Sequence, residues 1–409
     1  MRSLFRRAGA CAPALLALGA PARSDREADA ASWHIFSSPR APRGAPWRPQ
    51  PPLPAPEAPR AGAPPASVPD MIAAVLPSVI KIQGLLGERR VGGGSGFVVS
   101  AEGVCITNDH VVAGLKNMGC SELIAQFDDG RVFSLLPLTS DKEADIAVAR
   151  LAVPPDAPPF AFLRFGRSGA LRRGETVAVM GAPLGGSIVP AVGVLGGARF
   201  VADDESMNAV MHSRGDWELL QVDAAMSSGS SGGPIVDARG AVVGVSVLVQ
   251  TTPFGVGSLS YGVASDQVAP IVQQLLQSGE VTRAAVGLNI VVVDAFVAAR
   301  TLAATGVALL PPGAPAGLLV THAAAGRPGA AAGLRDGDVI VALNGEPAVR
   351  KGDFFRALGP VYDAARTLEA VVWRPLGPGR GGETATIRIA PAPRDEGTRV
   401  MLAGASRRA

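Results

Sequence analysis

Short apolar runs separated by turn residues fill the chain from about residue 79 to residue 264 and limit its fold more than any other feature. The runs are rich in valine, alanine and isoleucine, and sequences such as Asp-Asp-Gly and Glu-Gly lie between them. Only 5% of the residues are aromatic, so a core must be built from aliphatic side chains. Such runs are typical of strands. The sequence therefore predicts a mainly β fold, an antiparallel sandwich or barrel.

A serine- and glycine-rich segment, residues 227–233, interrupts two of these predicted strands. Its composition alone would also suit a flexible linker, but a linker seldom separates adjacent strands. A serine nucleophile needs a base to take its proton and backbone donors for the oxyanion that forms. Glycines allow the backbone to turn successive N–H groups toward one point. We therefore predict Ser231 as a nucleophile and the loop of Gly229, Ser230 and Ser231 as the oxyanion hole, with the Gly229 and Ser231 amides as the natural donors.

The base that takes the serine proton should be a histidine, and the chain has four: His34, His110, His212 and His322. His110 follows an apolar strand, whereas the others lie in the N-terminal segment, an irregular loop and the C-terminal part of the chain. The carboxylate that orients the imidazole should precede an apolar strand, which favours Asp145 over Asp141 and Asp109. The resulting chain order is histidine, aspartate, serine, as in chymotrypsin-type proteases.

Residues 106–112, 144–148 and 223–234 resemble the three catalytic blocks of the HtrA (Deg) serine proteases, and residues 94–99 and 260–264 are similar to two further strands of that family. The resemblance implies a chymotrypsin-like double β-barrel over residues 71–283. It also implies a homotrimer that degrades unfolded or damaged proteins after small aliphatic residues, without ATP, cofactor or metal. Asp109 before His110, and Ser230 where the family usually has asparagine, depart from the pattern. They motivate the alternative of a latent or inactive protease-fold holdase chaperone.

Residues 284–393 are similar to the PDZ domain of the same family, a small α+β module. Helices are expected over 294–304 and 353–365, and strands over 317–321, 338–343, 368–373 and 384–389. The resemblance implies that Val286, Gly287 and Leu288 form the loop that receives peptide C-termini.

The first 24 residues are rich in arginine and free of acidic residues, which favours a mitochondrial or plastid transit peptide over a secretory signal or an unprocessed tail. The single PDZ-like module makes the chain most like the mitochondrial branch of the family. A Pro/Ala-rich linker over 25–70 and a flexible tail over 394–409 are predicted to be disordered. A formal net charge of only +3 and the lack of a basic stripe give no support for nucleic-acid binding. The three cysteines, Cys11, Cys105 and Cys120, are predicted to be free or buried thiols.

Overall fold

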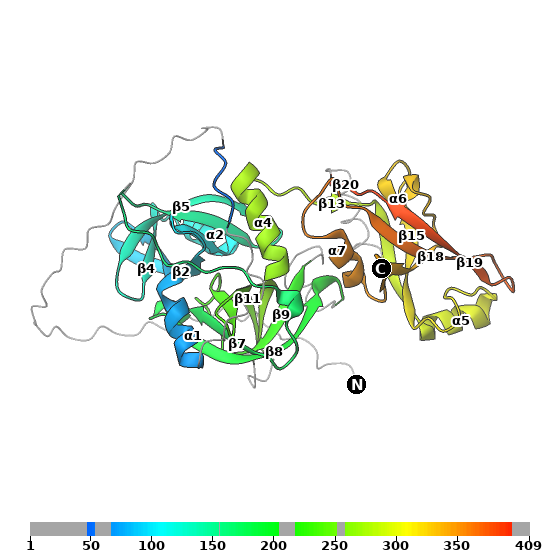
Figure 1. The fold of residues 1–409 in the computed structure, drawn as a ribbon, viewed down its shortest axis with the longest axis horizontal. Coiled ribbons are helices and arrows are strands. Elements are labelled where there is room, and N and C mark those ends of the chain that lie inside the picture. Colours follow the sequence, from blue (N-terminus) through cyan, green and yellow to red (C-terminus); the bar gives the residue numbers. More distant parts are fainter. Residues whose placement is uncertain (1–46, 54–66, 155, 204–216, 252–257, 395–409) are drawn as a thin grey trace, which may run out of the picture. The chain divides into compact units, whose positions relative to one another are not determined.

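The computed structural model describes residues 47–53, 67–154, 156–203, 217–251 and 258–394 (Figure 1). The predicted targeting peptide, most of the predicted linker and almost all of the predicted tail lie outside these residues. So do His34, His212 and Cys11, together with most of the polar segment between residues 201 and 218.

Six strands close into a first β-barrel in the order β1-β2-β3-β6-β5-β4. They are β1 (Val79–Leu86), β2 (Arg89–Val98), β3 (Val104–Thr107), β4 (Glu122–Phe127), β5 (Val132–Asp141) and β6 (Ile146–Leu151). The 3-10 turn η1 (Leu76–Ser78) joins β1 to the preceding helix, α1 (Val68–Val75). Helix α2 (Asp109–Asn117) begins directly after β3, and it buries Val111, Val112 and Leu115 against the barrel.

A second barrel closes in the order β10-β11-β12-β9-β8-β7. Its strands are β7 (Thr176–Gly181), β8 (Val189–Phe200), β9 (Glu218–Asp223), β10 (Pro234–Asp237), β11 (Val242–Thr251) and β12 (Ser258–Ala264). Three 3-10 turns accompany them, η2 (Ser168–Ala170), η3 (Pro183–Gly185) and η4 (Val201–Asp203). The predicted double β-barrel is therefore confirmed.

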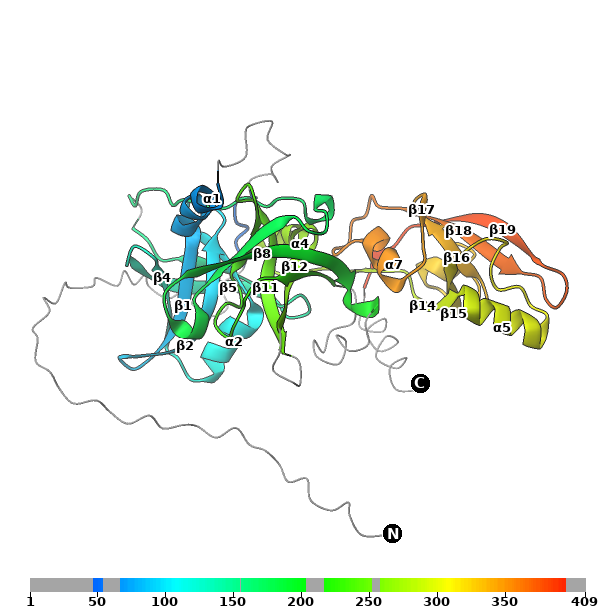
Figure 2. The same cartoon turned by 90° about the horizontal axis from the view of Figure 1, so that it is seen from below.

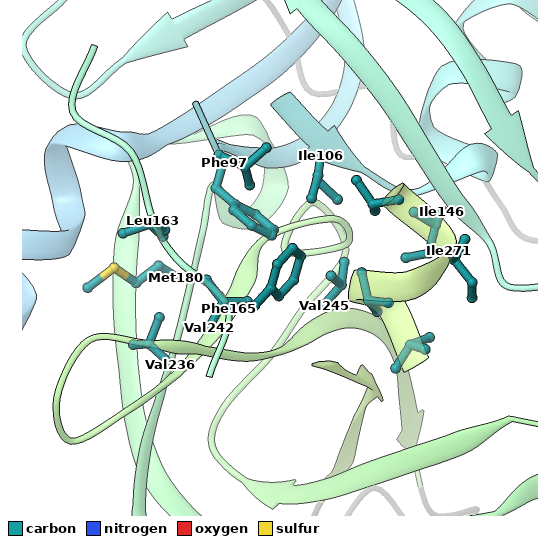
Figure 3. Packing of buried hydrophobic residues seen from close by; sticks show 14 of the residues in the cluster. Phe97, Ile106, Ile146, Leu163, Phe165, Met180, Val236, Val242, Val245 and Ile271 are labelled. Carbon is teal, nitrogen blue, oxygen red and sulfur yellow. The ribbon is translucent and has the colours of Figure 1, made fainter. Parts of the chain in front are cut away.

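One hydrophobic cluster joins the two barrels (Figure 3). Phe97 and Ile106 come from the first barrel, and Met180 and Val245 come from the second. The rings of Phe97 and Phe165 meet edge to face with their centroids 6.5 Å apart. The aliphatic side chains of both barrels share this close-packed core, so loops at the junction are positioned by both barrels.

Helix α4 (Ser265–Ser278) closes the second barrel with Val268, Ile271, Val272, Leu275 and Leu276 buried. Gly279 ends it in the left-handed conformation. Residues 47–53, which belong to the segment predicted as a linker, contact the end of this helix. The amide of Gln50 donates to the Leu276 carbonyl at 2.8 Å, and the Trp47 indole donates to the Gln277 carbonyl at 3.2 Å. The last carbonyls of a helix have no partner within the helix, so they accept these donors.

The C-terminal α+β region is built on a sheet with the strand order β14-β15-β16-β18-β19 (Figure 2). Strands β13 and β20 form a separate two-stranded pair (Figure 1). Its strands are β13 (Ala284–Ala285), β14 (Leu288–Asp294), β15 (Ala316–Ala323), β16 (Val339–Leu343), β17 (Glu346–Pro347), β18 (Leu368–Pro375), β19 (Gly382–Ile389) and β20 (Ala392–Pro393). Its helices are α5 (Ala295–Thr305), α6 (Pro328–Ala331) and α7 (Lys351–Leu358). The four predicted strands and the first predicted helix are confirmed. The second helix ends at Leu358 and not at residue 365, because Gly359 takes a φ of 80° and Pro360 cannot continue a helix.

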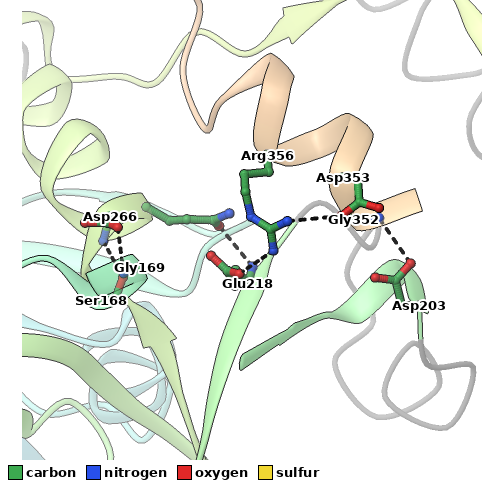
Figure 4. A network of polar contacts seen from close by, with 9 residues as sticks. Ser168, Gly169, Asp203, Glu218, Asp266, Gly352, Asp353 and Arg356 are labelled. Carbon is green, nitrogen blue, oxygen red and sulfur yellow. Dashed lines mark hydrogen bonds and ion pairs between the residues drawn. The ribbon is translucent and has the colours of Figure 1, made fainter. Parts of the chain in front are cut away.

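Helix α7 makes polar contacts with the second barrel (Figure 4). Arg356 donates to the Glu218 carboxylate at 2.8 Å, and the Gly352 amide donates to Asp203 at 3.1 Å. The rings of Phe200 and Phe355 stack with centroids 6.5 Å apart. These contacts tie the C-terminal region to strands β8 and β9.

Candidate active site

His110 and Asp145 are brought together by the pairing of β3 with β6. Thr107 at the end of β3 pairs with Ala147 near the start of β6. Because the strands are antiparallel, the residues that follow β3 lie beside the residues that precede β6. His110 stands in the first turn of α2, and Asp145 stands one residue before β6.

Asp145 holds both the ring and the backbone of His110. The distance from His110 Nδ1 to Asp145 Oδ2 is 2.6 Å, and the His110 amide donates to Asp145 Oδ1 at 2.8 Å. An ionised carboxylate can only accept, so this contact keeps the proton on Nδ1 and leaves Nε2 as an acceptor. Asp145 takes a φ of 55°, and its backbone carbonyl accepts a hydrogen bond from the side-chain Nδ2 of Asn108 at 2.8 Å.

The His110 imidazole binds a proton more tightly than an isolated histidine side chain does. Desolvation by burial lowers the pKa of His110, but the hydrogen bond and charge of Asp145 and the charge of Asp109 outweigh it. The pKa of His110 is therefore raised above its usual range. A base with such a pKa accepts a proton readily near neutral pH.

The two competing carboxylates make different contacts. Asp141 forms an ion pair with the buried guanidinium of Arg283. In the described part of the chain, Asp109 makes no hydrogen bond to the His110 ring, although its charge acts on it. Asp145 is thus the carboxylate whose geometry suits an orienting role.

The loop that carries Ser231 is pressed against the segment leading to His110. A Cβ atom on Gly232 would lie 2.3 Å from Thr107 Oγ1 and 3.0 Å from the Asn108 amide nitrogen, so only glycine fits there. The Ser231 hydroxyl is half-buried and donates to the Val247 carbonyl at 3.3 Å. No hydrogen bond joins it to the His110 ring within the described residues. Catalytic hydrogen bonds are often long or absent in a protein without substrate, and a rotation about the serine side chain would change its partner.

The amides of the predicted oxyanion loop differ in their partners. The Ser230 amide donates to the Ser227 carbonyl at 3.0 Å. Among the described residues, the amides of Gly229 and Ser231 have no hydrogen-bond acceptor. Such paired, unsatisfied amides are what an oxyanion hole requires.

Ser95 of β2, for which the sequence predicts no role, binds this loop from the first barrel through hydrogen bonds. Its amide donates to the Ser231 carbonyl at 2.8 Å, and its hydroxyl donates to the Gly229 carbonyl at 2.7 Å. The side chain of Ser95 is fully buried. The only sequence signal was the Gly-Ser-Gly motif at residues 94–96.

The residues predicted to bind peptide C-termini lie at the start of β14. The Val286 carbonyl accepts from Gly329 at 2.9 Å, and the Gly287 carbonyl accepts from Ala324 at 3.0 Å. Leu288 opens β14, which is an edge strand of its sheet.

Among the described residues, His322, Cys105 and Cys120 lie outside the site. His322 is half-exposed, with its Nδ1 atom 3.5 Å from Asp336. Cys105 is buried and Cys120 is half-buried, and both are free thiols. Within the described ranges, no cluster of three or more histidine, cysteine or acidic side chains could hold a metal ion, and no helix is long and apolar enough to span a bilayer.

Known proteases are similar to this chain in sequence. The family model for the trypsin-like peptidase domain matches residues 94–245. Over 312 residues the chain is 29% identical to a probable periplasmic DegP-like serine endoprotease of Brucella suis, which covers 76% of this chain and 55% of that protein. It is 30% identical over 261 residues to a putative serine protease, HhoA, of Synechocystis, covering 64% of this chain and 62% of that one. The chain is therefore similar in sequence to HtrA/DegP-like serine proteases.

Solved HtrA-type structures have the same fold. The HtrA-type protease AlgW with a decapeptide covers 81% of this chain and 99% of its own, with a TM-score of 0.58 and 22% identity. AlgW with a tripeptide gives a TM-score of 0.60 at 23% identity. The chain spans about half the length of the curated DegP-like relatives, 55% in the Brucella protein. These HtrA/DegP-like relatives are bacterial and cyanobacterial, so the mitochondrial branch remains a prediction from the sequence.

Proposed function

We propose that this HtrA-type chain is a serine endopeptidase that cleaves unfolded or damaged proteins without ATP. The observation that carries the proposal is the His110–Asp145 contact beside a serine loop with two unsatisfied amides. Asp145 fixes the ring tautomer in which Nε2 can take a proton.

The chemistry follows from these positions. The Ser231 hydroxyl attacks the scissile carbonyl carbon while His110 Nε2 takes the hydroxyl proton. The amides of Gly229 and Ser231 donate to the negative oxygen of the tetrahedral intermediate. His110 then gives the proton to the leaving amine, and the C–N bond breaks to leave an acyl-serine. Water, deprotonated by His110, attacks that ester, releases the acid product and restores Ser231.

The C-terminal region supports a second binding role within the same protein. Strand β14 is at an edge of its sheet, so an extended peptide could pair with it. We propose that Val286, Gly287 and Leu288 receive the carboxylate of a protein C-terminus there. The AlgW structures with bound peptides support peptide ligands for this type of protease. We also propose a homotrimer, which the resemblance supports, and an organellar location, which the arginine-rich first 24 residues support.

The purified chain is expected to cut β-casein, an unfolded protein, and to leave a stably folded protein of similar size intact. Mass spectrometry of the products should place the cuts after small aliphatic residues. Release of fragments with a different residue preference would contradict the substrate assignment.

The Ser231 hydroxyl bond to Val247 favours one alternative, a latent protease-fold holdase. In the same assay a holdase would keep a denatured client soluble and release no fragments. That result would replace the endopeptidase with a chaperone.

A further inference from the structure

A tight turn between β7 and β8 lies against the oxyanion loop. The Gly185 amide donates to the Ala182 carbonyl at 3.1 Å, and the Gly186 amide donates to the Pro183 carbonyl at 2.9 Å. Leu184 has a φ of 53°, and its side chain is 85% exposed. A left-handed leucine is strained, and it persists only when surrounding contacts hold it. The Leu184 side chain is exposed, so its burial cannot be what keeps the Leu184 backbone in the left-handed conformation.

The backbone of this turn orients the first oxyanion donor. The Leu184 amide donates to the Ser228 carbonyl at 2.7 Å. In a trans peptide the C=O and N–H bonds point in opposite directions. The Ser228 carbonyl is directed at Leu184, so the amide of Gly229 in the same peptide plane is directed away from the turn. If the turn relaxed, this peptide could rotate and withdraw the donor.

The turn and the oxyanion loop fit closely. A Cβ atom on Gly229 would lie 2.5 Å from the Ala182 carbonyl oxygen and 3.0 Å from the Leu184 nitrogen. A shift of the turn therefore moves against the backbone at Gly229. The two segments act as one packed unit.

Two side chains of the first barrel pin the turn at its two ends. The Ala182 amide donates to Ser95 Oγ at 2.8 Å. Lys81 of β1 donates from Nζ to the Gly185 carbonyl at 2.9 Å. The Lys81 bond is charge-assisted and comes from a half-buried side chain. Partial burial lowers the pKa of Lys81, because the ammonium group loses contact with water. The charge of Arg90 lowers this pKa further.

We propose that Lys81 is a positioning residue that holds the turn at residues 182–186 and, through it, the Gly229 amide in the orientation that stabilises the oxyanion. This inference rests on the proposed function, because it concerns the efficiency of the same acyl-transfer step. Lys81 touches no reacting atom. Its effect passes through the Gly185 carbonyl, the Leu184 amide and the Ser228 carbonyl.

The test compares Lys81→Met with wild type at a series of β-casein concentrations. Removing one oxyanion donor outright costs about 10²–10³-fold in kcat, so loosening it is expected to lower kcat by about tenfold. KM should change little, because the oxyanion exists only after attack. Lys81→Arg, which keeps a charged donor, should recover most of the loss. Lys116→Met, which removes an exposed lysine of α2, should match wild type.

The outcomes separate the two proposals. Wild-type protein that cuts no casein would overturn the proposed function and this inference with it. Active wild type with an unchanged kcat in folded Lys81→Met would overturn the inference alone. So would a rise in KM at constant kcat, or a Lys81→Arg variant as slow as Lys81→Met, because either would mean that the loss does not come from the missing donor.

Discussion

Replacing Ser231 with alanine is expected to abolish cleavage of β-casein, with kcat falling by about 10⁴–10⁶-fold. The variant has no oxygen to form the acyl-enzyme, while His110, Asp145 and the two free amides stay in place. Ser231 is half-buried and its hydroxyl makes one long contact, 3.3 Å to the Val247 carbonyl. The fold should therefore survive, and circular dichroism and the thermal unfolding midpoint would check that.

Ser278→Ala is a matched control for this change. Ser278 ends helix α4, and its hydroxyl donates only to nearby carbonyls, those of Gln274 and Glu280. Its removal should leave kcat and KM as in wild type. A Ser231→Ala protein that still cut casein at a rate within tenfold of wild type would show that another group is the nucleophile.

Asp145→Asn is expected to lower kcat by about 10⁴-fold while leaving the fold intact. Asparagine can keep the bond from the His110 amide through its oxygen, and its NH₂ group then faces Nδ1. Because an NH₂ group donates, Nδ1 must become the acceptor and the ring proton moves to Nε2. A protonated Nε2 cannot take the proton of Ser231. Steady-state rates on β-casein measure this loss.

The pH dependence of the remaining activity should also change. In wild type the hydrogen bond and charge of Asp145 raise the pKa of His110 against the opposing effect of burial. Activity needs neutral His110, so the acid limb of kcat/KM lies at the raised pKa and activity is lost as the pH falls through it. Without the Asp145 charge, burial dominates and the pKa of His110 falls. The acid limb of Asp145→Asn should therefore move to lower pH.

Asp109→Asn is the matched control for Asp145→Asn, because it removes a nearby negative charge without removing a hydrogen bond to the His110 ring. Asp109 raises the pKa of His110 only through its charge. Its removal should move the acid limb slightly to lower pH and keep kcat at its plateau close to wild type. A loss as large as that of Asp145→Asn would mean that Asp109 is the orienting carboxylate.

Much of the fold and the candidate site residues can be predicted from local sequence patterns. Valine-rich runs with Asp-Gly turns predict strands wherever they occur, and His110, Asp145 and Ser231 each stand next to such a run. The pairing of β3 with β6 then brings the first two together without any further signal. The helix predicted over 353–365 is too long, because Gly359 and Pro360 end it after Leu358.

Contacts between residues far apart in the chain were not predictable. Lys81 and Gly185 are 104 positions apart, and nothing in either local sequence indicates their hydrogen bond. The same holds for Asp141 and Arg283, and for the Trp47 segment on α4. The use of the Ser230 amide inside a turn also depends on backbone torsions that the Ser-Gly-Ser-Ser-Gly sequence leaves open. These features arise from how the barrels pack and not from the pattern of any one strand.

Covalent labelling of Ser231 tests the central claim most directly. Wild-type chain treated with a fluorophosphonate probe, digested and sequenced by mass spectrometry should carry the probe on the hydroxyl of Ser231, and labelling should be lost in the Asp145→Asn protein. A correctly folded wild-type chain that remains unlabelled, or that carries the probe on a different serine, would contradict the assignment of Ser231 as an activated nucleophile.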